Sequence, residues 1–229
     1  MKTAIVTGSA GNLGKAVVQK FTSEGYRVIG TVSRKDDVMS DISKDNFEAV
    51  MVDVSNEEAA TNFIQQTVST YGVIDVAVLT VGGFAMGSVA DTKTADITSQ
   101  YRLNFETAYN IARPVFVHMM QQRKGRIFLT GSRPGSSAKA ARGMVAYGLA
   151  KSLIFSLAEL LNDEAKGNDV VTSVVVPSMI DTEVNRKAMP GADFTAWVKP
   201  ASIAELIYFY CTEAAADLRE PVIKVYNKA

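Results

Sequence analysis

The chain has 229 residues, 47% of them hydrophobic, and its 24 Lys and Arg balance 24 Asp and Glu. That length suits one α/β domain with a sizeable core, and the balanced charge argues against a nucleic-acid or anionic-membrane partner. The single cysteine excludes an intrachain disulfide and is consistent with a reducing, cytoplasmic setting. Together with the single histidine it argues against a metal centre of the zinc type. No stretch approaches the roughly 20 apolar residues of a membrane span.

Short apolar runs alternate with stretches of helical periodicity along the whole chain. Predicted strands cover residues 3–7, 27–32, 47–54, 73–79, 126–130, 170–176 and 222–225. Predicted helices cover residues 15–24, 57–71 with Asn56 as the cap, 95–122, 146–165 and 201–212. Continuous Val and Ile runs indicate parallel strands that are covered on both faces. The alternation therefore predicts one Rossmann-type, doubly wound α/β domain over residues 1–229, with about seven strands and helices on both faces.

A glycine-rich turn joins the first predicted strand to the first predicted helix. Its glycines Gly8, Gly11 and Gly14 follow a G-x-x-G-x-x-G spacing. A tight turn, a close approach to a pyrophosphate and close helix–strand packing all exclude Cβ atoms. The helix start then offers free N–H groups to the phosphates. This placement predicts a dinucleotide site.

The end of the second strand bears on which dinucleotide is bound. NAD sites place an acid there, whereas this chain has no acid before Asp36 and offers Ser33, Arg34 and Lys35 for a 2′-phosphate. We therefore favour NADP(H), with NAD(H) as the alternative. Asp53, which ends the third strand, either accepts from the adenine amine or belongs to a turn.

Tyr147 and Lys151 stand four residues apart on one face of a predicted helix. A nearby ammonium stabilises a phenolate, so the pair predicts a Tyr147 pKa below its reference of about 10. A cationic nicotinamide would add to that effect. Tyr147 would then exchange protons near neutral pH.

These motifs resemble the short-chain dehydrogenase/reductase family over nearly the whole chain. The resemblance implies Tyr147, Lys151, Ser132 and Asn104 as catalytic residues, with Asn104 distorting its helix and supporting proton relay. Ser132 lies fifteen residues before Tyr147, which leaves Ser136 or Ser137 as alternatives. The family's subunits pair through two helices, which implies a homodimer or homotetramer. The implied cofactor contacts are Gly8, Ser9, Gly11, Asn12, Leu13, Gly14, Ser33, Arg34, Asp53, Val54, Val81, Gly82, Pro177, Ile180 and Thr182.

Departures from the usual family motifs resemble its dihydropteridine reductase branch. The G-x-x-G-x-x-G turn, the segment 81–84 and above all the segment 181–197 (DTEVNRKAMPGADFTAW) are similar to that branch. The resemblance implies a substrate lid over about 181–199, although the segment could equally be structural, with its aromatic residues plugging the end of the sheet. The candidate substrate contacts are Gly83, Phe84, Arg133, Met189, Phe194 and Trp197.

The sequence therefore predicts an enzyme that transfers hydride to a C=O or conjugated C=N carbon of a small molecule. The segment 181–197 favours a quinonoid dihydropteridine. Ser132 and the cations after the second strand favour the alternative, a general reductase of small ketones and aldehydes. A non-catalytic dinucleotide-binding sensor is a further alternative, against which the complete Tyr, Lys, Asn and Ser set argues.

Overall fold

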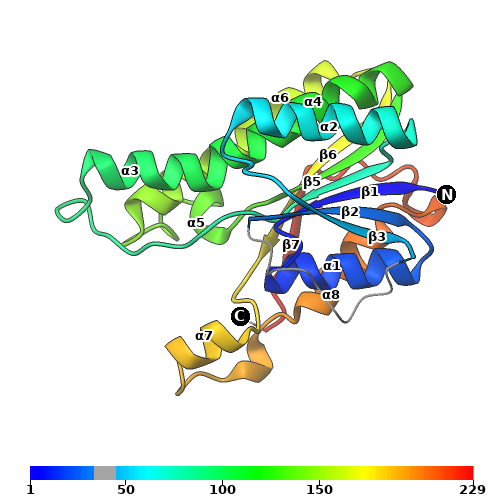
Figure 1. Cartoon of the computed structure of the whole chain (residues 1–229). Helices are drawn as coiled ribbons and strands as arrows, with labels where there is room; N and C mark the ends of the chain where they lie inside the picture. Colours follow the sequence, from blue (N-terminus) through cyan, green and yellow to red (C-terminus); the bar gives the residue numbers. More distant parts are fainter. Residues whose placement is uncertain (34–44, 229) are drawn as a thin grey trace.

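The computed structural model describes residues 1–33 and 45–228, which form a sheet between two layers of helices (Figure 1). Its strands are β1 (Thr3–Thr7), β2 (Arg27–Val32), β3 (Phe47–Met51), β4 (Val76–Leu79), β5 (Lys124–Thr130), β6 (Asp169–Pro177) and β7 (Val222–Val225). Its α-helices are α1 (Asn12–Ser23), α2 (Glu57–Tyr71), α3 (Thr94–Tyr101), α4 (Thr107–Gln122), α5 (Arg133–Ser136), α6 (Val145–Glu164), α7 (Glu183–Ala188) and α8 (Pro200–Phe209).

The seven strands form one parallel sheet in the order β3-β2-β1-β4-β5-β6-β7. The predicted fold class is thereby confirmed. The chain builds outward from β1 to β3, then returns to the other side of β1 with β4. In such sheets the crevice beyond the carboxyl ends of the two central strands is where ligands bind. The turn after β1 and the segment after β4 therefore mark the expected site.

Each face of the sheet has its own apolar core. One core packs under α2, α4 and α6 and includes Ile5, Ile111 and Leu129, while the other packs under α1 and α8 and includes Val17 and Ile203. Figure 1 shows these two helix layers above and below the sheet. Most of the core residues on the strands are β-branched, and the strands are covered on both faces.

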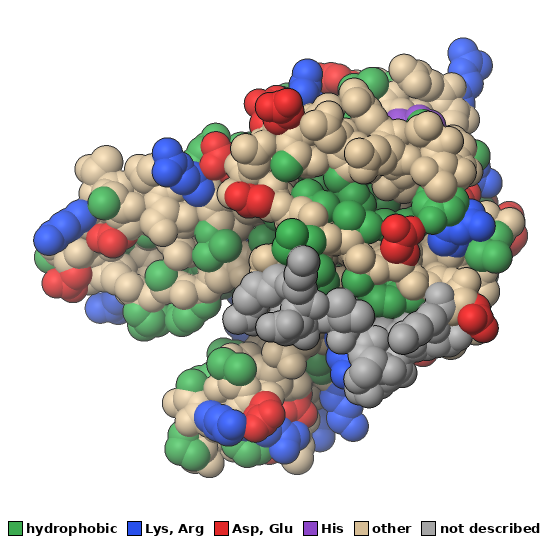
Figure 2. Space-filling model, in the orientation of Figure 1, with side chains coloured by type: hydrophobic (Ala, Val, Ile, Leu, Met, Phe, Trp, Pro, Cys, Tyr) green, Lys and Arg blue, Asp and Glu red, His purple; other side chains and the backbone are tan. Residues whose placement is uncertain are grey.

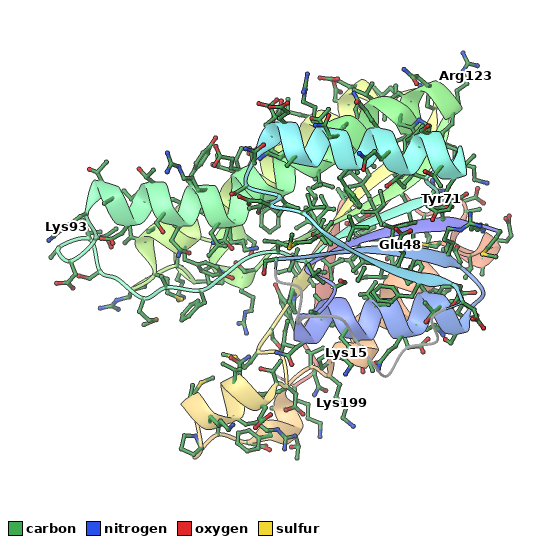
Figure 3. All side chains as sticks on the ribbon, in the orientation of Figure 1. Lys15, Glu48, Tyr71, Lys93, Arg123 and Lys199 are labelled. Atoms are coloured by element: carbon green, nitrogen blue, oxygen red, sulfur yellow. The ribbon has the colours of Figure 1, made fainter. Side chains whose placement is uncertain are left out.

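Local contacts explain where single elements begin and how they attach. The predicted cap is confirmed, because the Asn56 side chain accepts from the Ala59 N–H at 2.9 Å. At the other end of α2, the Tyr71 hydroxyl donates to Glu48 of β3 at 2.8 Å, and the two side chains point toward one another in Figure 3. This bond joins the helix layer to the edge strand.

Several element boundaries differ from the sequence-based expectation. The third strand ends at Met51 and the fourth begins only at Val76. The predicted helix over 95–122 is interrupted by a π-helical turn, Arg102–Glu106. The short helices α5 and α7 occupy segments for which we predicted no helix, and each begins at a side-chain cap, Ser132 or Thr182. Periodicity does not reveal a helix of only one or two turns.

Helix α6 is the one helix of the described residues that is long and apolar enough to cross a membrane by length and composition. Its mean hydropathy is 1.2, and 44% of that window is buried inside the chain. A core helix meets the same criterion, and the sheet-facing side of α6 contributes Ile154, Leu157 and Leu161 to the core.

Candidate active site

The glycine turn after β1 is as compact as its spacing predicts. Gly8 has a φ of 62°, in the left-handed region that favours glycine. A Cβ on Gly8 would stand 3.1 Å from the Val81 side chain, and a Cβ on Gly14 would collide with the carbonyl of Gly8. The Gly11 N–H donates to the Gly8 carbonyl at 2.9 Å and closes the turn. The backbone is thus free to approach a ligand.

Ser9 faces the protein interior rather than the pocket. It is fully buried, and its hydroxyl donates to the Thr31 carbonyl at 3.1 Å. The Thr31 hydroxyl in turn accepts from the Gly8 N–H at 3.2 Å. Gly30 makes room for this packing, because a Cβ there would stand 2.5 Å from the Ser9 side chain. Ser9 therefore supports the turn, since its backbone N–H also donates to the Thr31 carbonyl, at 3.0 Å.

A pocket of about 340 Å³ opens over this turn. Helix α1 begins at its floor, and no side chain caps the helix, so its first N–H groups face the pocket unpaired by a capping group. A pyrophosphate fits this combination of glycine backbone, free N–H groups and helix dipole. The pocket is lined by Gly8, Ala10, Gly11, Asn12, Leu13, Gly14, Thr31, Val32, Ser33, Thr80, Val81 and Gly82.

Only some of the residues predicted to bind the adenosine end of the cofactor line this pocket. Ser33 is exposed at the rim of the pocket. Arg34 lies outside the described residues. Asp53 bonds within its own turn, accepting from the Ser55 N–H at 3.0 Å and the Ser55 hydroxyl at 2.6 Å, and Val54 is buried beside it. Both readings of Asp53 remain open, since one oxygen can hold the turn while the other faces a ligand.

Ser132 and Tyr147 lie side by side beyond β5. Ser132 is 7% exposed and accepts from the Gly135 N–H at 3.2 Å, and its hydroxyl lies near enough to the Tyr147 phenol to lower the pKa of that phenol. Gly135 brings α5 against α6, because a Cβ there would stand 2.7 Å from the Lys151 backbone. The alternative Ser136 is turned away, with its hydroxyl donating to the Arg133 carbonyl at 2.9 Å. Ser132 is therefore the serine that the fold places beside the tyrosine.

Lys151 lies one helical turn beyond Tyr147 and is almost entirely enclosed. Only 4% of it is exposed, and its Nζ donates to the Thr130 carbonyl at 2.8 Å. Burial lowers the pKa of the Lys151 ammonium to about 8. Among the described residues no carboxylate pairs with this ammonium, and burying an unpaired ammonium is costly to the fold. Such pKa values cluster at functional sites.

The pKa of Tyr147 differs from the sequence-based expectation. Burial raises the pKa of the phenol above its usual value, and the hydrogen bond from Ser132 lowers it by a smaller amount. We expected the ammonium of Lys151 to dominate, but Lys151 Nζ is bonded to the Thr130 carbonyl instead. Desolvation therefore determines the direction of the Tyr147 pKa shift, and the phenol is protonated at neutral pH.

Asn104 lies in the middle of the π-helical turn and is 1% exposed. Its amide bonds the Gly83 backbone in both directions: Oδ1 accepts from the Gly83 N–H at 3.1 Å and Nδ2 donates to the Gly83 carbonyl at 3.0 Å. A Cβ on Gly82 would stand 2.7 Å from Asn104 Oδ1 and 3.2 Å from Lys151 Nζ. The expected helix distortion is present, and π-helical turns of this kind recur at functional sites.

The segment after β6, where we predicted a substrate lid, folds into the short helix α7 and a 3-10 turn, Phe194–Ala196. Thr182 caps α7 by accepting from the Asn185 N–H at 3.2 Å, and the Asn185 side chain donates to the Ile180 carbonyl at 2.8 Å. Both residues follow Pro177, the last residue of β6. Their polar groups thus hold α7 at the carboxyl edge of the sheet, on the same side as the glycine turn.

Within the lid the aromatic residues pack on one another. Phe194 contacts the Trp197 ring at 4.8 Å between centroids, and the Arg186 guanidinium stands 4.8 Å from the Phe194 ring. Trp197 is only 7% exposed and Met189 is half-buried at the end of α7. The buried Trp197 therefore packs against the rest of this segment. This placement favours a structural role for Trp197 over contact with a substrate.

On the opposite side of the site, Phe84 stands over Tyr147. The two rings meet edge to face, 5.2 Å between centroids, and Phe84 is 61% exposed. Arg133 is turned away, with its guanidinium 5.0 Å from the Tyr226 ring. Figure 2 shows a notch between the lobe that carries α3 and α5 and the lobe that carries α7.

Known proteins with similar sequences span almost the whole chain. Residues 2–193 match the family model described as short chain dehydrogenase. An acetoacetyl-CoA reductase of an Acinetobacter species is 26% identical over 94% of this chain and 92% of its own length. The 3-oxoacyl-(acyl-carrier-protein) reductase FabG of Vibrio cholerae is 25% identical over 98% of this chain and 95% of its own length.

Solved structures share the fold. The structure of ElxO with NADP bound superposes with a TM-score of 0.88, at 23% identity, over 98% of this chain and 96% of that one. A short-chain oxidoreductase from Burkholderia thailandensis gives a TM-score of 0.86 at 22% identity, over 99% of this chain and 91% of that one.

The fold and the site define an NAD(P)-dependent oxidoreductase with a Rossmann-type sheet. The chain belongs to the short-chain dehydrogenase/reductase family, as its motifs predicted. The dihydropteridine reductase branch stays a prediction, because the relatives named above are reductases of 3-oxoacyl substrates.

Sequence reasoning missed several residues that build the site. Thr31 and Gly30 seat the glycine turn, and the Thr130 carbonyl holds Lys151. Gln100 bonds Asn104 from the preceding helical turn. In the sequence, only the polar character of Gln100 and Thr31 within otherwise apolar patterns could have indicated that they contribute to the site.

Proposed function

We propose that this enzyme reduces a ketone to an alcohol with NADPH. The observation that carries the proposal is the contact between Ser132 and Tyr147, with Lys151 buried one turn away. Two hydroxyls that converge on one point can both donate to a carbonyl oxygen. A dihydropterin needs no such serine, and the predicted branch lacks one.

Each residue has a role that follows from its surroundings. Bound NADPH supplies the hydride to the carbonyl carbon. Tyr147 donates its proton to the oxygen as negative charge develops there, and its raised pKa keeps it protonated at neutral pH. Ser132 stabilises the same oxygen by a hydrogen bond. Lys151, held by the Thr130 carbonyl one helical turn away, would place a positive charge near the phenolate that remains.

The cofactor assignment is supported by the pocket and by the family. The glycine turn and the start of α1 would hold the pyrophosphate, while Ser33 and Arg34 would hold the 2′-phosphate of NADP. ElxO, which shares the fold, was solved with NADP bound. Ile180 and Thr182 would face the nicotinamide end. NAD(H) is the alternative cofactor, and a comparison of turnover with NADPH and with NADH distinguishes the two.

A quinonoid dihydropteridine is the second candidate substrate. The segment 181–197 favours it, since its sequence resembles that branch and forms a compact lid in which Arg186 bonds Asp181 at 2.6 Å and contacts Phe194. Against it stand the family relatives named for 3-oxoacyl substrates and the presence of Ser132.

One experiment separates these readings. NADPH and NADH consumption is followed with a 3-oxoacyl thioester, simple ketones and quinonoid dihydropterin, for the wild type and for Ser132→Ala. We expect NADPH-dependent ketone reduction that falls roughly a hundredfold in Ser132→Ala. Turnover of the dihydropterin alone, unaffected by Ser132→Ala, would replace the first candidate with the second. A preference for NADH would overturn the cofactor assignment.

We also propose that two copies of the chain pair through α4 and α6. Tyr101, Phe105 and Tyr109 form a row of ring contacts along α3 and α4, with centroid distances of 5.3 and 6.0 Å. Leu149 and Leu160 on α6 are 51% and 63% exposed. Exposed apolar faces of this kind mark interfaces, and Leu160→Glu should lower the mass measured by sedimentation.

A further inference from the structure

Gln100 is buried one helical turn before Asn104 and faces it. Gln100 is 8% exposed. Asn104 Nδ2 donates to Gln100 Oε1 at 3.0 Å and to the Gln100 backbone carbonyl at 3.2 Å. The hydrogen bond that the Gln100 side chain makes in the described structure goes to the amide of Asn104. A bond between two buried side-chain amides orients both groups.

The bonds to Asn104 allow its amide only one orientation. Nδ2 has three oxygen acceptors within reach, two from Gln100 and one from Gly83, while Oδ1 has the Gly83 N–H. The opposite orientation would place Oδ1 against three oxygens and Nδ2 against an N–H, so every one of these bonds would be lost. The Gln100 side chain supplies one of these three oxygens, and the backbone carbonyls of residues 100 and 83 supply the other two.

The orientation of Asn104 matters at Lys151. Asn104 Oδ1 and Lys151 Nζ both lie against Gly82, within 3.2 Å of the position that a Cβ there would occupy. The two groups therefore share Gly82 as a neighbour, and the partial negative charge of Oδ1 on that side favours the charged form of Lys151. A flipped amide would instead direct its NH₂ group toward the ammonium and disfavour the charged lysine.

We propose that Gln100 is a positioning residue of the active site, whose Oε1 holds Asn104 with its oxygen turned toward Gly82 and Lys151. The inference rests on the proposed function, because this orientation affects turnover only if Lys151 and Asn104 serve hydride transfer. Gln100 itself does not line the pocket over the glycine turn. It acts through Asn104.

The substitution that tests this inference fits the space available. Gln100 borders a cavity of about 440 Å³ beneath the segment 85–92, which is also lined by Asp91, Asp96 and Ser99. Gln100→Met keeps the length of the side chain and removes the acceptor. Gln100→Glu keeps an oxygen acceptor. Ser99→Ala changes the same cavity without touching Asn104 and is the matched control.

We expect Gln100→Met to lower kcat roughly tenfold with KM for NADPH unchanged, the factor that one hydrogen bond of about 1.4 kcal/mol accounts for. Gln100→Glu should recover most of the loss, and Ser99→Ala should match the wild type. In an Asn104→Ala background the effect of Gln100→Met should disappear, because residues that act through one another are not additive. Additive losses, or a loss that Gln100→Glu does not recover, would overturn the positioning role.

A measurement without turnover keeps this test separate from the proposed function. Hydrogen exchange of the Asn104 side-chain NH₂, followed by NMR, should be slow in the wild type and in Gln100→Glu and at least tenfold faster in Gln100→Met. Equal protection in all three proteins would refute the inference. If no substrate is turned over, the proposed function fails, while the exchange data still decide whether Gln100 holds Asn104.

Discussion

Replacing Lys151 with methionine should make the protein more stable while abolishing its activity. Burial lowers the pKa of Lys151 from 10.5 to about 8, so the folded chain binds this proton less tightly than the unfolded chain. At pH 7, below both values, the shift of about 2.5 units corresponds to roughly 3 kcal/mol of lost stability. Lys151→Met removes that cost. It also leaves the Thr130 carbonyl without its donor, which costs about 1 kcal/mol, for a net gain of about 2 kcal/mol.

The cost of burying Lys151 should also depend on pH. Stability of the wild type should rise with pH between about 8 and 10.5, where the unfolded chain holds the proton and the folded chain has released it. The advantage of Lys151→Met should therefore shrink by about 2 kcal/mol between pH 7 and pH 9.5, and other groups cancel in the difference. Urea unfolding of both proteins at the two pH values measures it. An unstable Lys151→Met at pH 7, or a difference independent of pH, would refute the argument that burial without a charge partner destabilises Lys151.

Three further substitutions test the cofactor turn, a helix cap and the substrate side. Gly14→Ala places a Cβ against the Gly8 carbonyl. NADPH binding, measured by fluorescence, should therefore weaken at least tenfold, and the free energy of unfolding should fall by about 2 kcal/mol. Unchanged binding would contradict the close packing of the turn. Asn56→Ala removes the cap of α2 and should cost about 1 kcal/mol in urea unfolding with kcat unchanged; an equal loss of kcat would link α2 to the site. Phe84→Ala should raise KM for the ketone severalfold without changing NADPH affinity, and an unaltered KM would remove Phe84 from the substrate contacts.

The sequence was sufficient for the fold and for much of the site's composition. Buried β-branched runs such as Thr3–Thr7, alternating with helices, indicate central parallel strands. The three glycines of the turn indicate close backbone packing, because each leaves out a Cβ atom. The cap at Asn56 followed from local chemistry alone. These features depend on residues close together in the chain.

Features that depend on distant contacts were not predictable in the same way. The direction of the Tyr147 pKa shift depends on how deeply α5 and α6 enclose the phenol, and the sequence suggested only the neighbouring charge. Ser9 faces inward because Gly30 on another strand leaves it room. The choice of Ser132 over Ser136 likewise required the placement of α5 against α6.

The central claim is that Tyr147 donates the proton in NADPH-dependent ketone reduction. Single-turnover oxidation of bound NADPH by a reactive ketone, compared between the wild type and Tyr147→Phe, tests it most directly. The phenylalanine keeps the ring contact with Phe84 and removes only the hydroxyl. We predict that NADPH binds equally well to both proteins and that the rate of hydride transfer falls roughly 10²–10⁴-fold in the variant. A rate within threefold of the wild type would contradict the claim.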